Sequence, residues 1–235
     1  MNYIFLVAGR GTRLQPLTLK QAKSMYKLDK STTVLQRMVS KIKEYDPQGN
    51  IIIVDGFMHE NIENEIQGAI FVRNPFYAVT NSIASLWFAR EYLLNDEVAI
   101  INGDIVMEDK LIRNVLCENT QKPFVMLDSS IKSDGDYNVQ VDGERVLVMS
   151  KDLDSYFGEY AGVTKLDKES AKKLHSVVEK MVNDEMYDQW YENALDLLIF
   201  NEDFELYYTD IADSKWTEVD CVNDMLLARQ IHEHK

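Results

Sequence analysis

Cysteine is scarce in this sequence: Cys117 and Cys221 are the only two among 235 residues, and they lie far apart. Because no CxxC spacing occurs, neither a disulfide framework nor a structural zinc site is expected. Long apolar runs are also missing, since no segment approaches the roughly 20 apolar residues that span a bilayer. The opening segment 1–9 lacks the basic region of a signal peptide. These absences predict a cytoplasmic protein that neither crosses nor binds a membrane.

Acidic residues are absent from one part of an otherwise acidic chain. The formal net charge of −14 argues against nucleic-acid binding, which needs a basic surface to displace counterions. Residues 1–28 nevertheless contain no Asp or Glu and five basic residues: Arg10, Arg13, Lys20, Lys23 and Lys27. This pattern fits either a chance cluster on a solvated face or a local site for anions such as phosphates. Composition alone does not separate the two.

The first half of the chain alternates between two hydrophobic patterns, without internal repeats or linkers rich in Pro, Gly or Ser. Short apolar runs rich in β-branched residues predict buried strands at 3–8, 51–54, 69–72, 98–102 and 124–127. Between them, apolar residues at helical spacing predict helices around 35–42 and 83–90. This alternation is typical of an α/β protein with a doubly wound, mainly parallel sheet.

The pattern changes after about residue 135. Alternating valines on either side of Asp142-Gly143 predict a hairpin over 139–148, because Asp-Gly suits a tight primed turn. Helices are predicted over 171–181 and 190–198. We expect a single domain over 1–235, with a nucleotide-binding core at 1–134 and a small antiparallel and helical acceptor-binding or lid region at 135–215. Residues 216–235 would return to the core. The second half would close over the crevice beyond the carboxyl ends of the strands.

A glycine-containing string follows the first predicted strand. Gly9 and Gly11 would let the backbone approach a ligand closely and point N–H groups at phosphate oxygens. Arg13 and Lys23 would add positive charge against a triphosphate. The third glycine of a dinucleotide-binding fingerprint is missing, which disfavours an NAD-dependent oxidoreductase, and the Gly-Lys-Ser/Thr of a P-loop never occurs. Gly-x-Gly alone is weak evidence, whereas the complete string is far more specific.

The string GRGTRLxPLT at 9–18, followed by Lys23, resembles the signature of the sugar-nucleotide pyrophosphorylases and their cytidylyltransferase relatives. Ala22 and Val7 depart from the usual Pro and Ala of that family, but neither change removes a charged group. The resemblance implies a Rossmann-like nucleotidyltransferase fold and an enzyme of EC 2.7.7 type. It also implies that Arg13 and Lys23 act on the reacting phosphates.

Two aspartates extend the resemblance. Asp104 ends the predicted strand 98–102 in a Gly-Asp pair, and Asp220 closes the WTEVD segment at 216–220. The resemblance implies that this pair holds Mg²⁺, although Asp104 considered alone could simply be a turn or N-cap residue. Glu218 could assist these aspartates or could be only an exposed strand residue, and we favour the second interpretation.

The segment NPFYAVTNSIASL at 74–86 resembles the Asn-rich loop and helix of the choline-phosphate cytidylyltransferase branch, as does GEYAG at 158–162. With the glycine string, it implies a nucleotide pocket. The residues implied are Val7, Ala8, Gly9, Gly11, Thr12, Thr80, Asn81 and Ser82. The last three could equally cap the helix that follows, and both roles are compatible.

The motifs favour CTP over UTP, but the phosphorylated acceptor is less well defined. Aromatic and acidic side chains in the second half could form a cation–π cage for a quaternary ammonium such as phosphocholine. The candidates are Tyr137, Glu159, Tyr160, Trp190, Tyr191 and Glu192. Ordinary core or rim packing is the alternative for these residues. A sugar 1-phosphate is an alternative acceptor, and a non-catalytic nucleotide or sugar-phosphate sensor is an alternative of another class.

Overall fold

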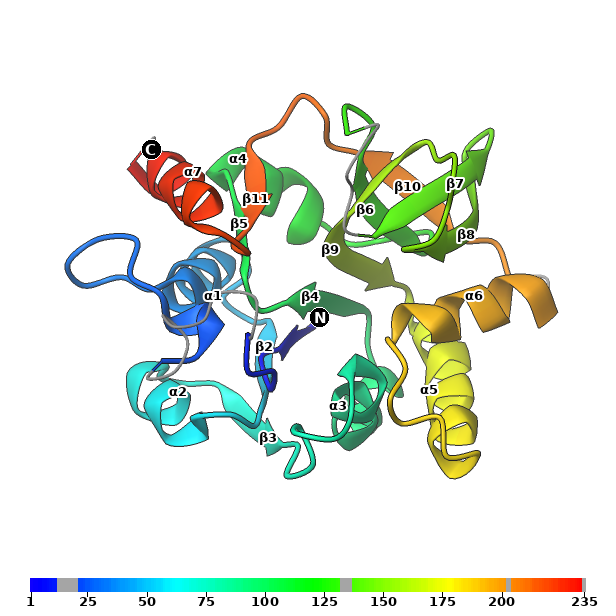
Figure 1. Cartoon of the computed structure of the whole chain (residues 1–235), viewed down its shortest axis with the longest axis horizontal. Helices are drawn as coiled ribbons and strands as arrows, with labels where there is room; N and C mark the ends of the chain where they lie inside the picture. Colours follow the sequence, from blue (N-terminus) through cyan, green and yellow to red (C-terminus); the bar gives the residue numbers. More distant parts are fainter. Residues whose placement is uncertain (12–20, 132–136, 202–203, 234–235) are drawn as a thin grey trace.

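The computed structural model describes residues 1–11, 21–131, 137–201 and 204–233. Nine strands form one sheet in the order β3-β2-β1-β4-β9-β6-β10-β8-β7 (Figure 1). The first four in this order are parallel: β3 (Ile70–Arg73), β2 (Asn50–Asp55), β1 (Asn2–Leu6) and β4 (Val98–Asn102). With β6 (Phe124–Asp128), they confirm the five predicted strands to within two residues at each end. The fold is the expected Rossmann-like α/β type.

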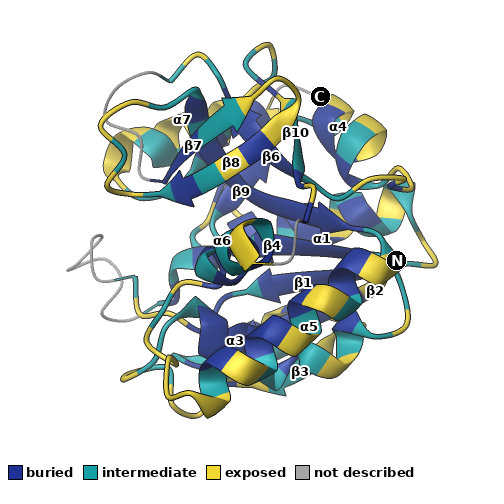
Figure 2. Cartoon of the chain, turned by 90° about the vertical axis from the view of Figure 1, so that its right-hand side faces the viewer, coloured by how far each residue is buried: buried dark blue, intermediate teal, exposed yellow. Residues whose placement is uncertain are grey.

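The central strands are buried on both faces because helices cover each side (Figure 2). Tyr3 and Phe5 of β1 pack with α1 (Val34–Tyr45), α2 (His59–Glu65) and the π-helical segment Ile112–Leu116. Ile4 points to the opposite face. There, the core includes residues of α3 (Ser82–Phe88), α5 (Lys168–Asn183) and α6 (Glu192–Asn201). Burying each such large apolar side chain contributes about 1.5–3 kcal/mol. Among the described residues, no helix is both long and apolar enough to cross a bilayer.

The second half of the chain adds a closed ring of strands to this sheet. β9 (Gly158–Leu166) pairs antiparallel with β4, β6 and β7 (Asn138–Asp142). β10 (Tyr207–Asp210) and β8 (Arg145–Ser150) complete the ring between β6 and β7. The predicted hairpin is confirmed as β7 and β8, and Gly143 in its turn has a φ of 57°. β9 therefore joins the nucleotide-type sheet to the antiparallel addition.

A small two-stranded sheet brings the C-terminal region back to the core. β5 (Ile105–Met107) pairs antiparallel with β11 (Trp216–Glu218), and Glu218 stands opposite Ile105. After β11, the chain enters α7 (Val222–Glu233), whose Ala228 and Ile231 are buried beside Val106. The register places the residues after β11 beside the residues before β5.

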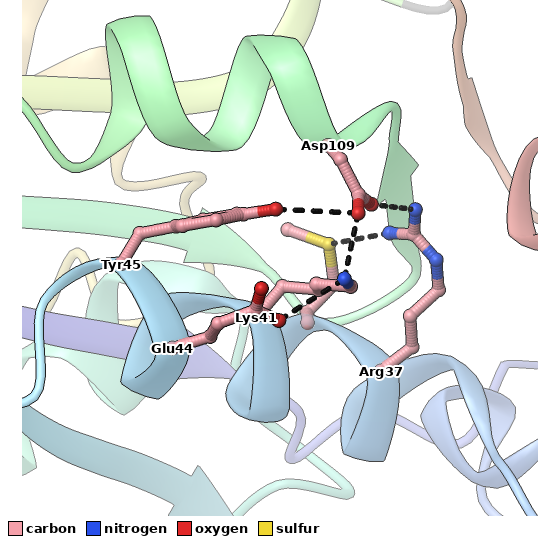
Figure 3. Close-up of polar contacts among 6 residues, drawn as sticks. Arg37, Lys41, Glu44, Tyr45 and Asp109 are labelled. Atoms are coloured by element: carbon pink, nitrogen blue, oxygen red, sulfur yellow. Dashed lines mark hydrogen bonds and ion pairs between the residues drawn. The ribbon is translucent and has the colours of Figure 1, made fainter. Parts of the chain in front are cut away.

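A polar cluster fastens α1 to α4 (Asp109–Leu111), two residues after β5 (Figure 3). Arg37 Nη2 lies 2.9 Å from Asp109 Oδ1, and Lys41 Nζ lies 2.6 Å from Asp109 Oδ2. The Tyr45 hydroxyl also donates to Asp109 Oδ2, at 3.3 Å. The side chain of Arg37 is only 3% exposed, so its charge depends on this carboxylate. The cluster thereby fixes the end of β5 against α1.

Replacing Asp109 by asparagine should lower the free energy of unfolding by about 2–3 kcal/mol, because the buried Arg37 charge loses its counter-ion. The expected loss lies at the low end for a broken buried pair, since Asp109 is itself 28% exposed. Urea unfolding monitored by circular dichroism measures it. The control is Glu44→Gln, which removes an exposed partner of Lys41 and should cost less than about 1 kcal/mol. Equal losses in the two variants would contradict this role of Asp109.

Candidate functional site

A cavity of about 280 Å³ opens where β1 and β4 end. Its described lining comprises Leu6, Val7, Ala8, Gly9, Gly11, Lys23, Ser24, Asn74, Tyr77, Thr80, Asn81, Ser82, Ser85, Asn102, Gly103, Asp104, Trp190, Glu218 and Asp220. These residues include every described residue of the expected nucleotide pocket, together with Lys23, both expected metal aspartates and Trp190. Thr12 and Arg13 lie outside the described residues. The structure thus gathers segments from both ends of the chain around one cavity.

Two backbone segments approach each other closely at the floor of this cavity. The Gly103 N–H donates to the carbonyl of Leu6, with an N–O distance of 3.1 Å. A Cβ at residue 103 would collide with the Val7 side chain, so glycine is needed for this approach. Gly11 adopts a φ of 59°, in the left-handed region that favours glycine. The approach places Asp104 directly beside the end of β1.

Three carboxylates converge at the cavity. Asp104, Glu218 and Asp220 each offer an oxygen, and the three oxygens lie within 4.8 Å of one another. The pairing of β5 with β11 causes this meeting, because it continues as a hydrogen bond of 3.0 Å from Val219 N to Asp104 O. Asp224 Oδ2 then accepts from Asp220 N at 2.9 Å, which fixes the turn into α7. The expectation that Glu218 is merely an exposed strand residue is wrong: it is half-buried and belongs to the cluster.

Lys23 lies among these carboxylates. Its Nζ forms ion pairs with Asp104 Oδ2 and Asp220 Oδ1. A short 3₁₀ turn over Lys23–Met25 positions it, anchored by the buried side chain of Met25. Burial lowers the pKa of Lys23, but the charges of Asp104, Glu218 and Asp220 raise the pKa by more, to a value above that of a free lysine. Lys23 therefore stays protonated, and its single positive charge offsets part of the negative charge of the three carboxylates.

The donor set fits a hard divalent cation. Carboxylate oxygens are the ligands that Mg²⁺ prefers, usually from one or two side chains plus substrate phosphates. Asp104 Oδ1 is buried and has no hydrogen-bond partner among the described residues, although its other oxygen is paired with Lys23. An isolated buried carboxylate oxygen is costly unless a ligand or ion completes its coordination. This orphaned oxygen is consistent with a metal ligand.

The loop between β3 and α3 forms another wall of the cavity. Buried Asn74 donates through Nδ2 to Ser85 Oγ at 3.0 Å and to Thr80 Oγ1 at 3.2 Å. Asn81 caps α3 by accepting from the Ser82 N–H at 2.8 Å. Capping and cavity lining thus occur together, as the sequence allowed. Asn74 was not among the predicted site residues, although it begins the segment 74–86 and directly follows β3.

Ser82 also links the two halves of the chain. Its hydroxyl oxygen accepts from the Tyr191 N–H at 2.8 Å, just before α6 begins. The backbone N–H groups of Asn81 and Ile83 donate to the carbonyls of Tyr187 and Gln189. The loop that carries Trp190 is therefore held against the start of α3, which explains why Trp190 reaches the cavity.

The remaining acceptor candidates lie mostly in a buried polar cluster. The hydroxyls of Tyr160, Thr164 and Tyr191 bond to one another, and all three side chains are fully or almost fully buried. The ring of Tyr137 meets that of Tyr160 edge-on, with 6.2 Å between centroids. Glu159 is half-buried, on β9 opposite Asp128 of β6. Of these six described candidates, only Trp190 lines the cavity. An acceptor-binding role stays a prediction for all six.

Glu192 and Asp196 give this cluster an unusual electrostatic character. Glu192 is buried, and its Oε2 has no hydrogen-bond partner among the described residues. Burial raises its pKa to about 8, although the Lys151 charge acts in the opposite direction. Burial also raises the pKa of Asp196 to about 7, against a hydrogen bond from Met149 N. At neutral pH the carboxyl group of Glu192 is therefore largely protonated, whereas that of Asp196 is about half protonated.

A family model described as nucleotidyl transferase matches residues 2–144, more than half of the chain. The chain belongs to the nucleotidyl transferase family. The matched region of this nucleotidyltransferase contains the glycine string, Lys23 and Asp104, whereas Asp220 lies beyond it. The family assignment and the fold agree with the resemblance on which the sequence analysis relied.

Several curated relatives of this nucleotidyltransferase are cytidylyltransferases. The choline-phosphate cytidylyltransferase of Streptococcus pneumoniae is 26% identical over 234 residues, which cover 95% of each protein. The CTP:phosphoglutamine cytidylyltransferase of Campylobacter jejuni is 23% identical, and the aligned region covers 96% of this chain and 98% of that protein. The solved structure of the streptococcal CTP:phosphocholine enzyme has a TM-score of 0.81 at 24% identity and covers 98% of both chains. The fold therefore extends over essentially the whole length of these proteins.

Proposed function

We propose that this nucleotidyltransferase transfers CMP from CTP to a small phosphorylated headgroup, phosphocholine or a similar phosphate or phosphonate, and releases pyrophosphate with Mg²⁺. The observation that carries the proposal is the meeting of Asp104, Glu218, Asp220 and Lys23 beside the glycine-walled cavity. Relatives of similar length that act on phosphocholine and phosphoglutamine with CTP support the choice of nucleotide and acceptor class.

The cavity floor and walls would bind the nucleotide. The backbone of Gly9 and Gly11 would approach the phosphates closely, with Val7 and Ala8 of the cavity lining beside them. Thr12 lies outside the described residues, and its contact with the nucleotide stays a prediction of the resemblance. Thr80, Asn81 and Ser82 would contact the nucleotide from the opposite wall. Such contacts would hold the α-phosphate in line with the attacking oxygen, which is the main contribution that a protein makes to phosphoryl-type transfer.

Asp104 and Asp220 would hold Mg²⁺, with Glu218 close enough to contribute. Bound there, the ion would supply charge neutralisation for the reacting phosphates. Lys23 and Arg13 would stabilise the charge that develops as pyrophosphate leaves. The acceptor phosphate is already anionic at neutral pH, so none of the four histidines is needed as a general base. A cytoplasmic location and a single domain over 1–235 remain predictions of the sequence.

Trp190 is the best supported acceptor contact, because it lines the cavity from the second half of the chain and is 40% exposed. Lys151 Nζ lies 4.5 Å from the centre of its ring, so this aromatic face already attracts a cation. A cationic headgroup such as choline would have to displace Lys151 from this face or use the other face of the ring. The other five acceptor candidates would shape the wall behind Trp190 and would touch the acceptor only after rearrangement.

Pyrophosphate release with each of the four NTPs and a panel of phosphorylated acceptors tests the proposal. We expect release to require Mg²⁺, to be fastest with CTP and to require a headgroup phosphate or phosphonate. Addition of EDTA should abolish it. Activity only with a sugar 1-phosphate would correct the acceptor class. Nucleotide binding without release for any pair would favour a sensor and overturn the proposed reaction.

A further inference from the structure

The ammonium group of Lys23 pairs with two of the carboxylates that would hold the proposed metal ion. Its partners are Asp220 Oδ1 and Asp104 Oδ2, while the nearest oxygens of these aspartates and of Glu218 lie within 4.8 Å of one another. A Mg²⁺ ion sits about 2.1 Å from each ligand oxygen. A divalent ion on the same oxygens would therefore lie next to the ammonium, where two positive charges repel each other strongly in a partly buried site.

We propose that Lys23 is an internal counter-ion for the ligand-free site and that it must leave the carboxylates before the metal ion binds. This inference rests on the proposed metal role of Asp104 and Asp220. The triphosphate of the incoming nucleotide offers Lys23 new anionic partners, so nucleotide binding releases the carboxylates. Metal binding and nucleotide binding are then thermodynamically coupled, and each raises the affinity of the other.

The surroundings of Lys23 support such an exchange. Its side chain is 14% exposed and borders the cavity, so the ammonium reaches the cavity by side-chain rotation alone. The turn that carries it stays anchored, because Ser24 and Met25 are buried and Met25 belongs to the same core cluster as residues of α1. Asp104 Oδ1 is buried and has no hydrogen-bond partner among the described residues, so the ammonium of Lys23 satisfies this carboxylate only in part.

Binding of Mn²⁺ alone, measured by the loss of its free EPR signal, tests this proposal without any turnover. Wild-type protein should bind Mn²⁺ weakly when no nucleotide is present. Lys23→Met, which keeps the length of the side chain and removes the ammonium, should bind Mn²⁺ at least ~10-fold more tightly, within the usual range of coupling between sites. Lys23→Arg keeps the positive charge and should bind Mn²⁺ as weakly as wild type.

Lys27→Met is the matched control, because it removes the same charge from an exposed residue of the same acid-free segment. It should change the Mn²⁺ affinity less than ~2-fold, since exposed charges are largely screened. If Lys23→Met fails to fold, Lys23→Gln serves the same purpose. A neutral Lys23 variant that binds Mn²⁺ no more tightly than wild type or Lys27→Met overturns the proposal. Absence of pyrophosphate release by wild type would instead refute only the proposed reaction, because metal binding is measured separately.

Discussion

Replacing Asp104 by asparagine should lower turnover by at least ~100-fold, within the range for losing one electrostatic group at a reacting centre. Asp104 Oδ2 pairs with Lys23, and the buried Oδ1 is left to bind a metal ion. An amide at this position lacks the negative charge that both interactions need. The fold should survive, because Lys23 retains its ion pair with Asp220. Steady-state pyrophosphate release with saturating CTP and acceptor measures the effect.

The control for this prediction is Asp213→Asn, which makes the same chemical change at an exposed residue just before β11. It should leave turnover within about twofold of wild type, as expected for a surface substitution. Circular dichroism and urea unfolding should give similar midpoints for both variants. Near-wild-type turnover in Asp104→Asn would remove the metal role from this residue and with it the proposed mechanism.

A second large effect is expected from Glu192→Gln, on stability rather than turnover. The pKa of Glu192 is about 8 in the folded protein and 4.5 in a free glutamate. The native state therefore holds a proton that the unfolded state releases between these two pH values. This contribution to stability is fully present below pH 4.5 and is lost as the pH rises toward 8. Between pH 5.5 and 8.5, the loss should be on the order of 3 kcal/mol.

Glutamine keeps a neutral side chain at every pH, so Glu192→Gln should lose much less stability than wild type over the same interval. Urea unfolding midpoints at pH 5.5, 7 and 8.5 give the slope of stability against pH for wild type and for the variant. The stability of the variant should still fall somewhat with pH, because the pKa of Asp196 is also raised, but its slope should be smaller than that of wild type. Glu60→Gln, at an exposed position of α2, should keep the wild-type slope. Parallel slopes for wild type and Glu192→Gln would show that Glu192 is ionised in the folded state.

The sequence predicted the elements whose residues are buried on both faces of the sheet. The apolar run of β4 and the helical spacing of apolar residues in α1 can be recognised in the sequence. In both elements, the residues that favour the local structure are also the residues that become buried. β9 was missed because it contains two glycines and a buried Lys165, whose Nζ donates to backbone carbonyls that include that of Val115. A buried ammonium group in a central strand is tolerated here because carbonyl groups at the end of a distant helical segment accept its hydrogen bonds. The local sequence pattern does not reveal these acceptors.

The same distinction applies to the site. The string after β1, Asp104 and Asp220 could be found because a family resemblance links residues that are far apart. Glu218 was misjudged, because its place in the carboxylate cluster depends on the register of β11 against β5. The aromatic acceptor candidates were named by residue type, which fits core packing as well as ligand binding. Tyr160 and Tyr191 satisfy each other's hydroxyls in the core, and residue type alone does not distinguish such a pair from a binding cage.

The antiparallel pairing of β5 with β11 makes the carboxylate cluster a property of the complete fold. Residues separated by more than a hundred positions meet there only after the last strand has docked, so the denatured chain contains nothing resembling this arrangement. By mass action, ions and nucleotides that bind there favour the native population alone. A higher ligand concentration would thus raise the free energy of unfolding, and with it the resistance to heat.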